Sequence, residues 1–263
     1  MYGAESTNMT IRLVSPEQYS KVKSLLFDLL GVASFESLHQ FDVAANDILV
    51  CCTDNFKDCM VIFRKINVLI VTSSKTVLEG FLKKLGREKG YAFRCPEWMA
   101  PTVLKRFPPK EAEYKGVVLL TYATSRNDFK KHSNVQFNVR ILCEDNANEV
   151  TSILGDNWSP ESIRERIKKG LFYGVYEGNK PISWLGTIWE SDKACEIGFA
   201  YTREGYRGKG LMKTLTSFIT GRILEKGKIP ILHTVETNTP AIKIAESLGY
   251  GVKAREWAYF YNL

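Results

Sequence analysis

A short glycine-containing loop is the part of this 263-residue sequence whose residue spacing most clearly indicates chemistry. It reads Tyr206-Arg207-Gly208-Lys209-Gly210-Leu211 and lies between a predicted strand and a predicted helix. Gly208 and Gly210 allow the backbone to turn tightly and to approach a ligand closely, because glycine has no Cβ atom. The free amides at the start of the following helix point at one spot, with the positive end of the helix dipole behind them. That spot suits a pyrophosphate, although the same spacing also occurs in simple tight connections.

Histidine and cysteine residues do not have the spacing of metal ligands. The six cysteines lack any paired CxxC arrangement, which predicts reduced thiols inside the cell and no zinc or other metal. His39 and His132 lie in polar or helical surroundings without Cys or Asp partners at ligand spacing. His233 lies in the middle of a predicted strand, on the parity of Ile231 and Val235, which favours a satisfied core histidine over a catalytic base.

The elements around the glycine loop form an alternating series. Period-two patterning and short turns predict three strands in an antiparallel meander, at Leu171–Glu177, Ile182–Trp189 and Ala194–Tyr201. After the loop we expect a helix, a strand, a helix and a last strand, at Leu211–Glu225, Pro230–Thr237, Pro240–Leu248 and Val252–Tyr261. Before the meander we expect a strand and two helices, at Val135–Ile141, Asn146–Leu154 and Pro160–Lys169.

The first half of the chain also mixes helices and strands. A helix is predicted from Ser15 to Gly31, followed by three strands and a second helix, at Asp47–Cys52, Cys59–Phe63, Val68–Thr72 and Lys75–Leu85. The four prolines between Tyr91 and Lys115 resist both helix and central strand, so an irregular connection with short turns is expected there. A strand resumes at Val117–Tyr122.

The glycine loop resembles motif A of the GNAT acyltransferases, written R/Q-x-x-G-x-G/A. Arg207, Gly208, Lys209, Gly210, Leu211 and Met212 occupy its six positions. Met212 departs from the pattern, since the family has a small residue there. A second run is similar to the family's N-x-x-A-x-x-x-Y-E-x-x-G-F: it starts at Asn238-Thr239-Pro240-Ala241 and continues through Ala245-Glu246-Ser247-Leu248-Gly249-Tyr250.

Within that superfamily, the sequence most resembles the glycine N-acyltransferase-like branch, also grouped with FR47-like domains. Three runs and one terminal residue carry this resemblance: Asn157-Trp158, Lys180-Pro181-Ile182-Ser183-Trp184, Ala194-Cys195-Glu196-Ile197-Gly198-Phe199 and Trp257. They span most of the chain from Asn134 to Leu263. For the first half, the resemblance implies a degenerate lobe of the same fold.

The resemblance implies that the protein binds acyl-CoA, or coenzyme A, as an acyl donor. The amides of Lys209, Gly210 and Leu211 would hold the pyrophosphate, with Arg207, Gly208 and Met212 completing the loop. A strand amide near Gly198 to Ala200 would polarise the thioester carbonyl, so Phe199, Ala200 and Tyr201 are included among the donor-binding residues. Asn238 would contact the pantetheine arm, and it can equally cap the next helix.

The resemblance also places a proton-accepting glutamate on the third meander strand, at Glu196. An amine nucleophile must lose a proton before it attacks a thioester, and a carboxylate near the cleft helps directly or through water. Glu196 could alternatively be an outward, solvated strand residue. Where many family members have a tyrosine that protonates the leaving thiolate, this chain has Ala245. Solvent, Tyr201, Tyr250 or the low basicity of the thiolate itself would then have to suffice.

Composition limits the other function classes. The formal net charge is +7, but the basic residues are dispersed without the aromatic-interleaved runs of a nucleic-acid surface, so no nucleic-acid partner is expected. No apolar stretch approaches the roughly 20 residues of a membrane span. Residues 1–10 contain Glu5 and no Arg or Lys, which is a poor match to a cleaved mitochondrial presequence. We therefore expect an intracellular protein, in the cytoplasm rather than the mitochondrion.

These patterns predict an α+β chain with a mixed, mostly antiparallel sheet flanked by helices, divided into residues 1–133 and 134–263. The predicted function is acyl-CoA-dependent transfer of an acyl group to a small amine, such as glycine or another amino acid, by direct attack in a ternary complex. Two alternatives remain open: a protein or peptide N-acetyltransferase, and a non-catalytic acyl-CoA-binding protein.

Overall fold

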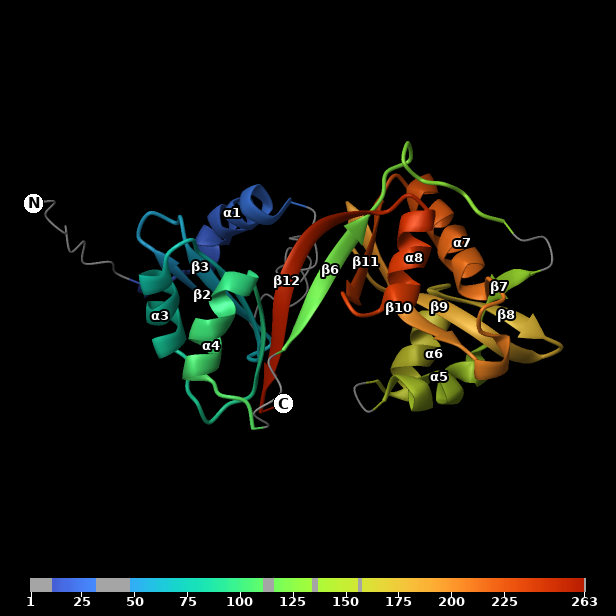
Figure 1. Cartoon of the computed structure of the whole chain (residues 1–263), viewed down its shortest axis with the longest axis horizontal. Helices are drawn as coiled ribbons and strands as arrows, with labels where there is room; N and C mark the ends of the chain where they lie inside the picture. The colour runs from blue at the N-terminus through green and yellow to red at the C-terminus, as the bar shows by residue number, and fades with distance from the viewer. Residues whose placement is uncertain (1–10, 32–47, 111–115, 134–136, 156–157, 263) are drawn as a thin grey trace, which may run out of the picture. The chain divides into compact units, whose positions relative to one another are not determined.

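The computed structural model describes residues 11–31, 48–110, 116–133, 137–155 and 158–262. The chain forms two compact units (Figure 1), the first made of Met1–Leu120 with Ala254–Leu263 and the second of Thr121–Lys253. This division differs from the predicted boundary after residue 133. Among the described residues, no helix is long and apolar enough to cross a membrane.

Among the described residues, the strands of the first unit lie side by side in the order β1-β2-β3-β4-β5-β12. Its strands are β1 (Ile11–Leu13), β2 (Ile48–Thr53), β3 (Cys59–Phe63), β4 (Asn67–Val71), β5 (Tyr91–Cys95) and β12 (Gly251–Tyr261). The pairs β1–β2, β2–β3, β3–β4 and β5–β12 are antiparallel, and β4 pairs with β5 in parallel. Helix α1 (Tyr19–Leu30) covers one face, with Val22 and Leu26 in a core that includes Val50. Helices α3 (Lys75–Lys83) and α4 (Ala100–Arg106) cover the other.

The prediction of an irregular segment at Tyr91–Lys115 was wrong for its first part. Strand β5, a short 3-10 helix at Glu97–Met99 and helix α4 fill the segment up to Arg106. The prolines start elements here rather than break them: Pro96 precedes the 3-10 helix, and Pro101 lies in the first turn of α4, where no amide donor is needed. Residues 111–115 lie outside the described residues.

Strand β12 explains why the last residues belong to the first unit. From Trp257 to Tyr261 it pairs antiparallel with β5. The side chains of Trp257 and Tyr259 are buried in the first core, and the Tyr259 hydroxyl donates to the carbonyl of Phe107 at 2.9 Å. A division based on motif positions along the chain could not detect this pairing.

The second unit has the sheet order β6-β11-β10-β9-β8-β7. The strands are β6 (Val117–Ala123, whose last three residues belong to this unit), β7 (Val139–Ile141), β8 (Phe172–Glu177), β9 (Lys180–Glu190), β10 (Ala194–Thr202) and β11 (Ile229–Val235). The meander β8-β9-β10 is antiparallel, as predicted, and β10 pairs with β11 in parallel. Strand β7 is shorter than the predicted Val135–Ile141, of which residues 135 and 136 lie outside the described residues.

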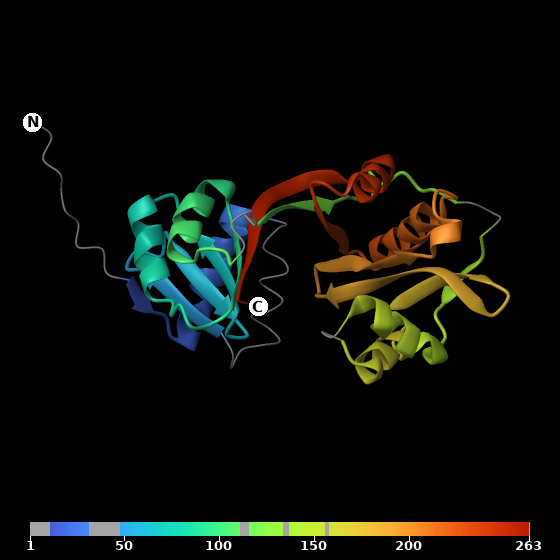
Figure 2. The same ribbon diagram turned by 60° about the horizontal axis from the view of Figure 1, so that its bottom comes forward.

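Helices cover both faces of this second sheet. Helix α7 (Leu211–Glu225) packs Leu215 and Ile219 on one face, against strand residues that include Ile197. Helices α5 (Ala147–Leu154) and α6 (Pro160–Lys168) pack on the opposite face. Figures 1 and 2 show the orange α7 and the yellow-green pair α5 and α6 on the two sides of the sheet. Helix α8 (Thr239–Ser247) follows β11. The predicted fold class, α+β with a mixed sheet flanked by helices, is confirmed.

Candidate active site

The two parallel strands of the second unit separate part of the way along their length. Strands β10 and β11 pair from Ala194 and Ile229 up to Ile197 and Leu232, although both strands continue beyond that point. Past the last pair there is a cavity of about 280 Å³, whose walls come from β6, β9, β10, β11, α7 and α8. The separation of the strands therefore opens the sheet where a ligand can enter it.

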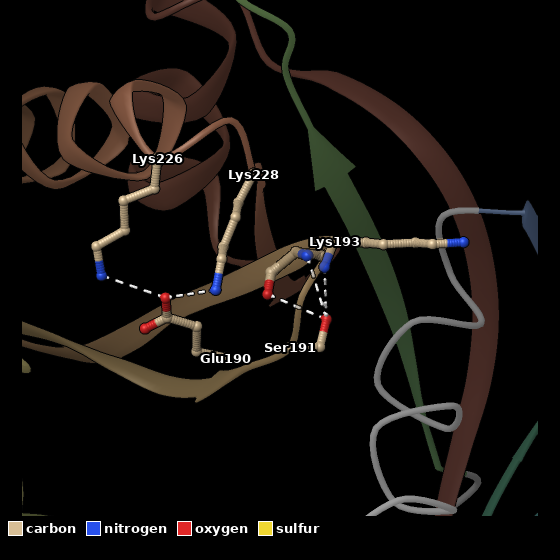
Figure 3. A network of polar contacts seen from close by, with 6 residues as sticks. Glu190, Ser191, Lys193, Lys226 and Lys228 are labelled. Carbon is tan, nitrogen blue, oxygen red and sulfur yellow. Dashed lines mark hydrogen bonds and ion pairs between the residues drawn. The ribbon is translucent and has the colours of Figure 1, made fainter.

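The paired end of the two strands is fixed by an ion-pair network (Figure 3). Glu190 at the end of β9 accepts hydrogen bonds from Lys226 at 3.2 Å and Lys228 at 2.7 Å. Burial opposes ionisation of Glu190, but these two bonds outweigh it and hold its pKa below the ordinary value. Ser191 bonds the carbonyl and amide of Ala194 in the next turn. The network ties the ends of β9 and α7 to the start of β10 and β11.

A bulge in β10 redirects the side chains at the cavity wall. Gly198 is opposite Gly186 and Tyr201 is opposite Trp184, so β10 has one residue more than β9 between these pairs. Phe199 lies in the bulge with a φ of 58°, in the left-handed region that non-glycine residues rarely adopt. A bulge leaves its extra residue outside the ladder. This conformation brings the peptide groups around Phe199 and Ala200 to the cavity, which both residues line.

The bulge also turns Phe199 to the face opposite Ile197. Two residues apart on a regular strand they would share a face, yet Ile197 packs with α7 and Phe199 packs on the α5 and α6 side. There the Phe199 ring stacks on Phe172 at 5.3 Å and meets the edge of Trp158 at 4.9 Å. Asn157, predicted together with Trp158, lies outside the described residues.

Gly198 is required by a second irregularity in the same ladder. Ile188 on β9 is an extra residue between the pairs Glu196–Trp189 and Ile197–Thr187. A Cβ atom at Gly198 would lie 2.4 Å from Ile188 Cδ1 and 2.7 Å from its Cγ1. The two bulges therefore fit together only because position 198 has no side chain.

Glu196 is buried, with 5% of its surface exposed, so it is not an outward solvated residue. Its Oε1 lies 2.8 Å from Nδ1 of His233 on the neighbouring strand β11. Its neighbours Cys195 and Ile197 both pack toward α7, so Glu196 faces the other side of the sheet. A buried carboxylate needs such a partner, because loss of hydration without one is costly.

His233 has a role that the sequence did not predict. It is satisfied by a hydrogen bond, as a core histidine would be, but its partner is Glu196 and its side chain lines the cavity. The two residues form an acid–imidazole pair at the point where β10 and β11 stop pairing. Only a prediction that the strands of Glu196 and His233 are neighbours in the sheet could have suggested this pair.

The glycine loop has the open conformation that the spacing predicted. Gly208 and Gly210 have φ values of 76° and 83°, and Gly210 is the N-terminal cap of α7. A Cβ atom at either position would meet no protein atom within 4 Å. The glycines are therefore needed for the backbone turn, and the space above the first amides of α7 is not filled by protein. The Lys209 ammonium lies 4.9 Å from the centre of the Tyr206 ring.

The other residues predicted to bind the donor divide into two groups. Met212 and Asn238 line the cavity together with Phe199 and Ala200. Asn238 also accepts a hydrogen bond from the amide of Ala241 at 3.3 Å, so it both caps α8 and faces the cavity. Leu211 is buried in the core beneath the loop, and Arg207 donates to the carbonyl of Thr202 at 3.2 Å.

Tyr201 and Tyr250, the two hydroxyls considered as proton donors, are not among the residues that line the cavity. The Tyr201 ring lies 4.4 Å from that of Trp184. The Tyr250 hydroxyl is 2.6 Å from Thr220 Oγ1, and burial raises its pKa well above the ordinary value. Ala245 does line the cavity, and so does Tyr122 of β6, which the motifs could not identify because it precedes the matched region.

Comparisons with known proteins agree with this geometry. The family model described as FR47-like protein matches residues 172–258. No match to a curated protein sequence is significant.

Among the described residues, no group of three or more His, Cys, Asp or Glu side chains could hold a metal ion.

Solved structures with the same fold cover nearly the whole chain. A Drosophila protein matches with a TM-score of 0.69 at 16% identity, over 95% of this chain and 98% of its own. A GCN5-related N-acetyltransferase from Sphaerobacter thermophilus matches with a TM-score of 0.69 at 12% identity, over 97% and 95%. A tandem GNAT protein from the clavulanic acid biosynthesis pathway matches with a TM-score of 0.57 at 9% identity, over 96% and 98%. The chain thus has the GNAT fold, and its segment 172–258 is similar to the FR47-like family.

Proposed function

We propose that this protein transfers an acyl group from acyl-CoA to the amine of a small acceptor, such as glycine or another amino acid, by direct attack in a ternary complex. The observation that carries the proposal is the 2.8 Å hydrogen bond between the buried Glu196 and His233, of which His233 lines the cavity where β10 and β11 separate. A proton acceptor and a cleft for a thioester arm are thereby adjacent.

The donor would run from the glycine loop into the cavity. The amides of Lys209, Gly210 and Leu211 would hold the pyrophosphate, because the first amides of a helix lack intrahelical partners and the helix dipole favours an anion there. The pantetheine arm would follow the cavity wall past Met212 and Asn238, which both line it. Amides of the β10 bulge would then polarise the thioester carbonyl.

Glu196 would accept the proton that the amine must lose. An α-amino group has a pKa of about 7.7 to 8.0 and is largely protonated at neutral pH. Glu196 would take this proton directly or through a water molecule, and His233 would hold the carboxylate in place. The free amine then forms the C–N bond, and the electron pair of the breaking C–S bond leaves with sulfur.

Burial of the pair supports a small acceptor over a protein lysine or N-terminus. Glu196 and His233 have only 7% and 13% of their side-chain surfaces exposed. A small amine can approach such recessed groups with little rearrangement of the walls. Transfer to a peptide amine is the alternative that an acceptor panel containing peptides would reveal.

A non-catalytic acyl-CoA binder is the second candidate, and Ala245 is the observation that favours it. This residue lines the cavity and has no proton to give to a leaving thiolate. A binder would take up acyl-CoA without turnover, whether or not Glu196 is intact.

The test is thiol release from acetyl-CoA and longer acyl-CoA donors with a panel of amino acids, other amines and peptides. We expect CoA release that depends on a small amine, and we expect Glu196→Gln to lower kcat/KM by about 100-fold or more without weakening donor binding. Glu225→Gln, at an exposed position on α7, is the matched control. Donor binding without release of CoA by any acceptor would instead favour the binder.

A further inference from the structure

The cavity contains few groups that could stabilise a leaving thiolate. Among the described residues that line it, those with a hydroxyl or imidazole proton are Tyr122, Thr216, Thr234 and His233. Thr216 donates to the carbonyl of Met212 in its own helix at 2.8 Å. His233 is bonded to Glu196. Threonine hydroxyls carry no acidic proton, so the phenol of Tyr122 is the most acidic hydroxyl in the wall.

Tyr122 belongs to a strand that precedes the sequence motifs of the site. It lies on β6, next to β11 in the sheet, and only 2% of its surface is exposed. On the same wall, α8 contributes Ala241 and Ala245, whose small side chains leave room in front of the phenol. The Tyr122 hydroxyl donates to Glu246 Oε1 at 3.4 Å, and this glutamate is exposed. A bond of that length to a solvated group is readily exchanged for another acceptor.

We propose that the Tyr122 hydroxyl donates a hydrogen bond to the sulfur of the acyl donor as the C–S bond breaks, taking the place that the side chain at Ala245 cannot fill. This inference rests on the proposed acyl transfer. The electron pair of the C–S bond goes to sulfur, and the thiolate leaves hydrogen-bonded to the phenol. Its proton comes afterwards from water.

The proton of Tyr122 stays on oxygen in this step. Burial, then the charge of Glu246 and the hydrogen bond to it, raise the pKa of the phenol above its ordinary value. A free thiol has a pKa of about 8.5, so complete proton transfer to the thiolate would be unfavourable. A neutral phenol that remains protonated is instead a fixed donor aimed at developing negative charge, which accelerates the step without a proton transfer.

The experiment compares Tyr122→Phe with the full-length wild type, using acetyl-CoA turnover and the pKa of the bound CoA thiol. The phenylalanine ring keeps the packing and removes only the donor. We expect kcat to fall on the order of 10- to 100-fold while the Kd for CoA is unchanged. We also expect the bound thiol, followed by the ultraviolet absorbance of the thiolate, to titrate at a higher pH in the variant.

Tyr250→Phe is the matched control, because it removes a buried hydroxyl of the same unit that does not line the cavity. It should leave both readouts unchanged. An unchanged kcat in Tyr122→Phe, or a lower kcat without any shift of the thiol pKa, would overturn the assignment. Failure of the proposed function is distinct, because the wild type itself would then release no CoA, and the role of Tyr122 would fall with it.

Discussion

Glu196 is a carboxylate that the fold keeps almost fully out of water, and its partner His233 lies 37 residues further along the chain. Its position on β10 follows from the strand pattern, but its bond to His233 depends on the parallel pairing of β10 with β11. Residue types and spacing could therefore identify Glu196 as a candidate base, whereas they predicted that His233 is a core histidine. In the structure the two residues are hydrogen-bonded to each other.

Replacement of His233 tests this pair at the level of stability. His233→Ala would leave a buried carboxylate without its donor, so we expect the free energy of unfolding to fall by about 1–3 kcal/mol. His233→Asn keeps an N–H donor near the position of Nδ1 and should recover part of that loss. Urea unfolding monitors stability, and kcat/KM should follow the same order. Equal stability of all three proteins would contradict a structural role for the bond.

Gly198→Ala tests the fit of the two bulges. The new Cβ atom would overlap Ile188, whose Cδ1 lies 2.4 Å from the ideal position, and overpacking of this kind costs about 1–3 kcal/mol. We expect Ile188→Ala to be less harmful in the Gly198→Ala background than in the wild type, because it removes the clash. A double-mutant cycle on unfolding free energies measures this coupling. Strict additivity of the two changes would be the contrary result.

At the scale of elements, the network in Figure 3 holds the paired end of β10 and β11, and the opposite ends separate at the cavity. Glu190 has a folded pKa below its ordinary value of 4.5. A depressed carboxylate pKa contributes stability at pH values above the unfolded pKa, and this contribution is lost as the pH falls through the folded value. The contribution of this network to the stability of the paired strands is therefore lost in acid.

Glu190→Gln should flatten the acid side of the stability profile. At neutral pH we expect the variant to be less stable than wild type by about 1 kcal/mol or less, since both lysines and the carboxylate are partly exposed. Well below pH 4.5 the difference should disappear, because the wild-type carboxylate is then protonated as well. Urea midpoints at the two pH values give the comparison. A difference that persists or grows in acid would show that the charge is not the cause.

Most elements of the second unit were predictable from the sequence, and the reasons are local. Ser159 caps α6 through the amide of Ser162, Pro160 lies in its first turn, and short turns join the meander strands. The β10 bulge and the contribution of Tyr122 were not predictable, since both depend on contacts between strands. The segment at Tyr91–Lys115 was misread for a different reason: its prolines obscured the alternation of Tyr91, Phe93 and Cys95, whose side chains are buried along β5.

At the scale of the whole molecule, the chain order and the two compact units do not coincide. Strand β6 begins in the first unit and ends in the second, while β12 begins in the second and ends in the first. The candidate site, including Tyr122, uses only residues of the second unit. The first unit has its own two cores, one of which contains Trp257 and Tyr259.

Deletion of the residues after Lys253 should therefore affect the two units differently. It removes the strand that pairs with β5 and two buried aromatic side chains, so we expect the amides of β5 and α4 to lose hydrogen-exchange protection. Protection of α7 and uptake of CoA should be retained. If CoA binding were lost while β5 stayed protected, the assignment of the last residues to the first unit would be wrong.

The proposed docking of the CoA pyrophosphate at the start of α7 can be tested by calorimetric titration with CoA. Wild type should bind, and Gly210→Glu should not, because a carboxylate would then stand where the anion docks. Gly227→Glu is the matched control: Gly227 follows the other end of the same helix, with a φ of 74° and equally open space, so it carries the same backbone strain. We predict that this control binds CoA like the wild type. No heat of binding with wild type, or equal binding by Gly210→Glu, would contradict the account.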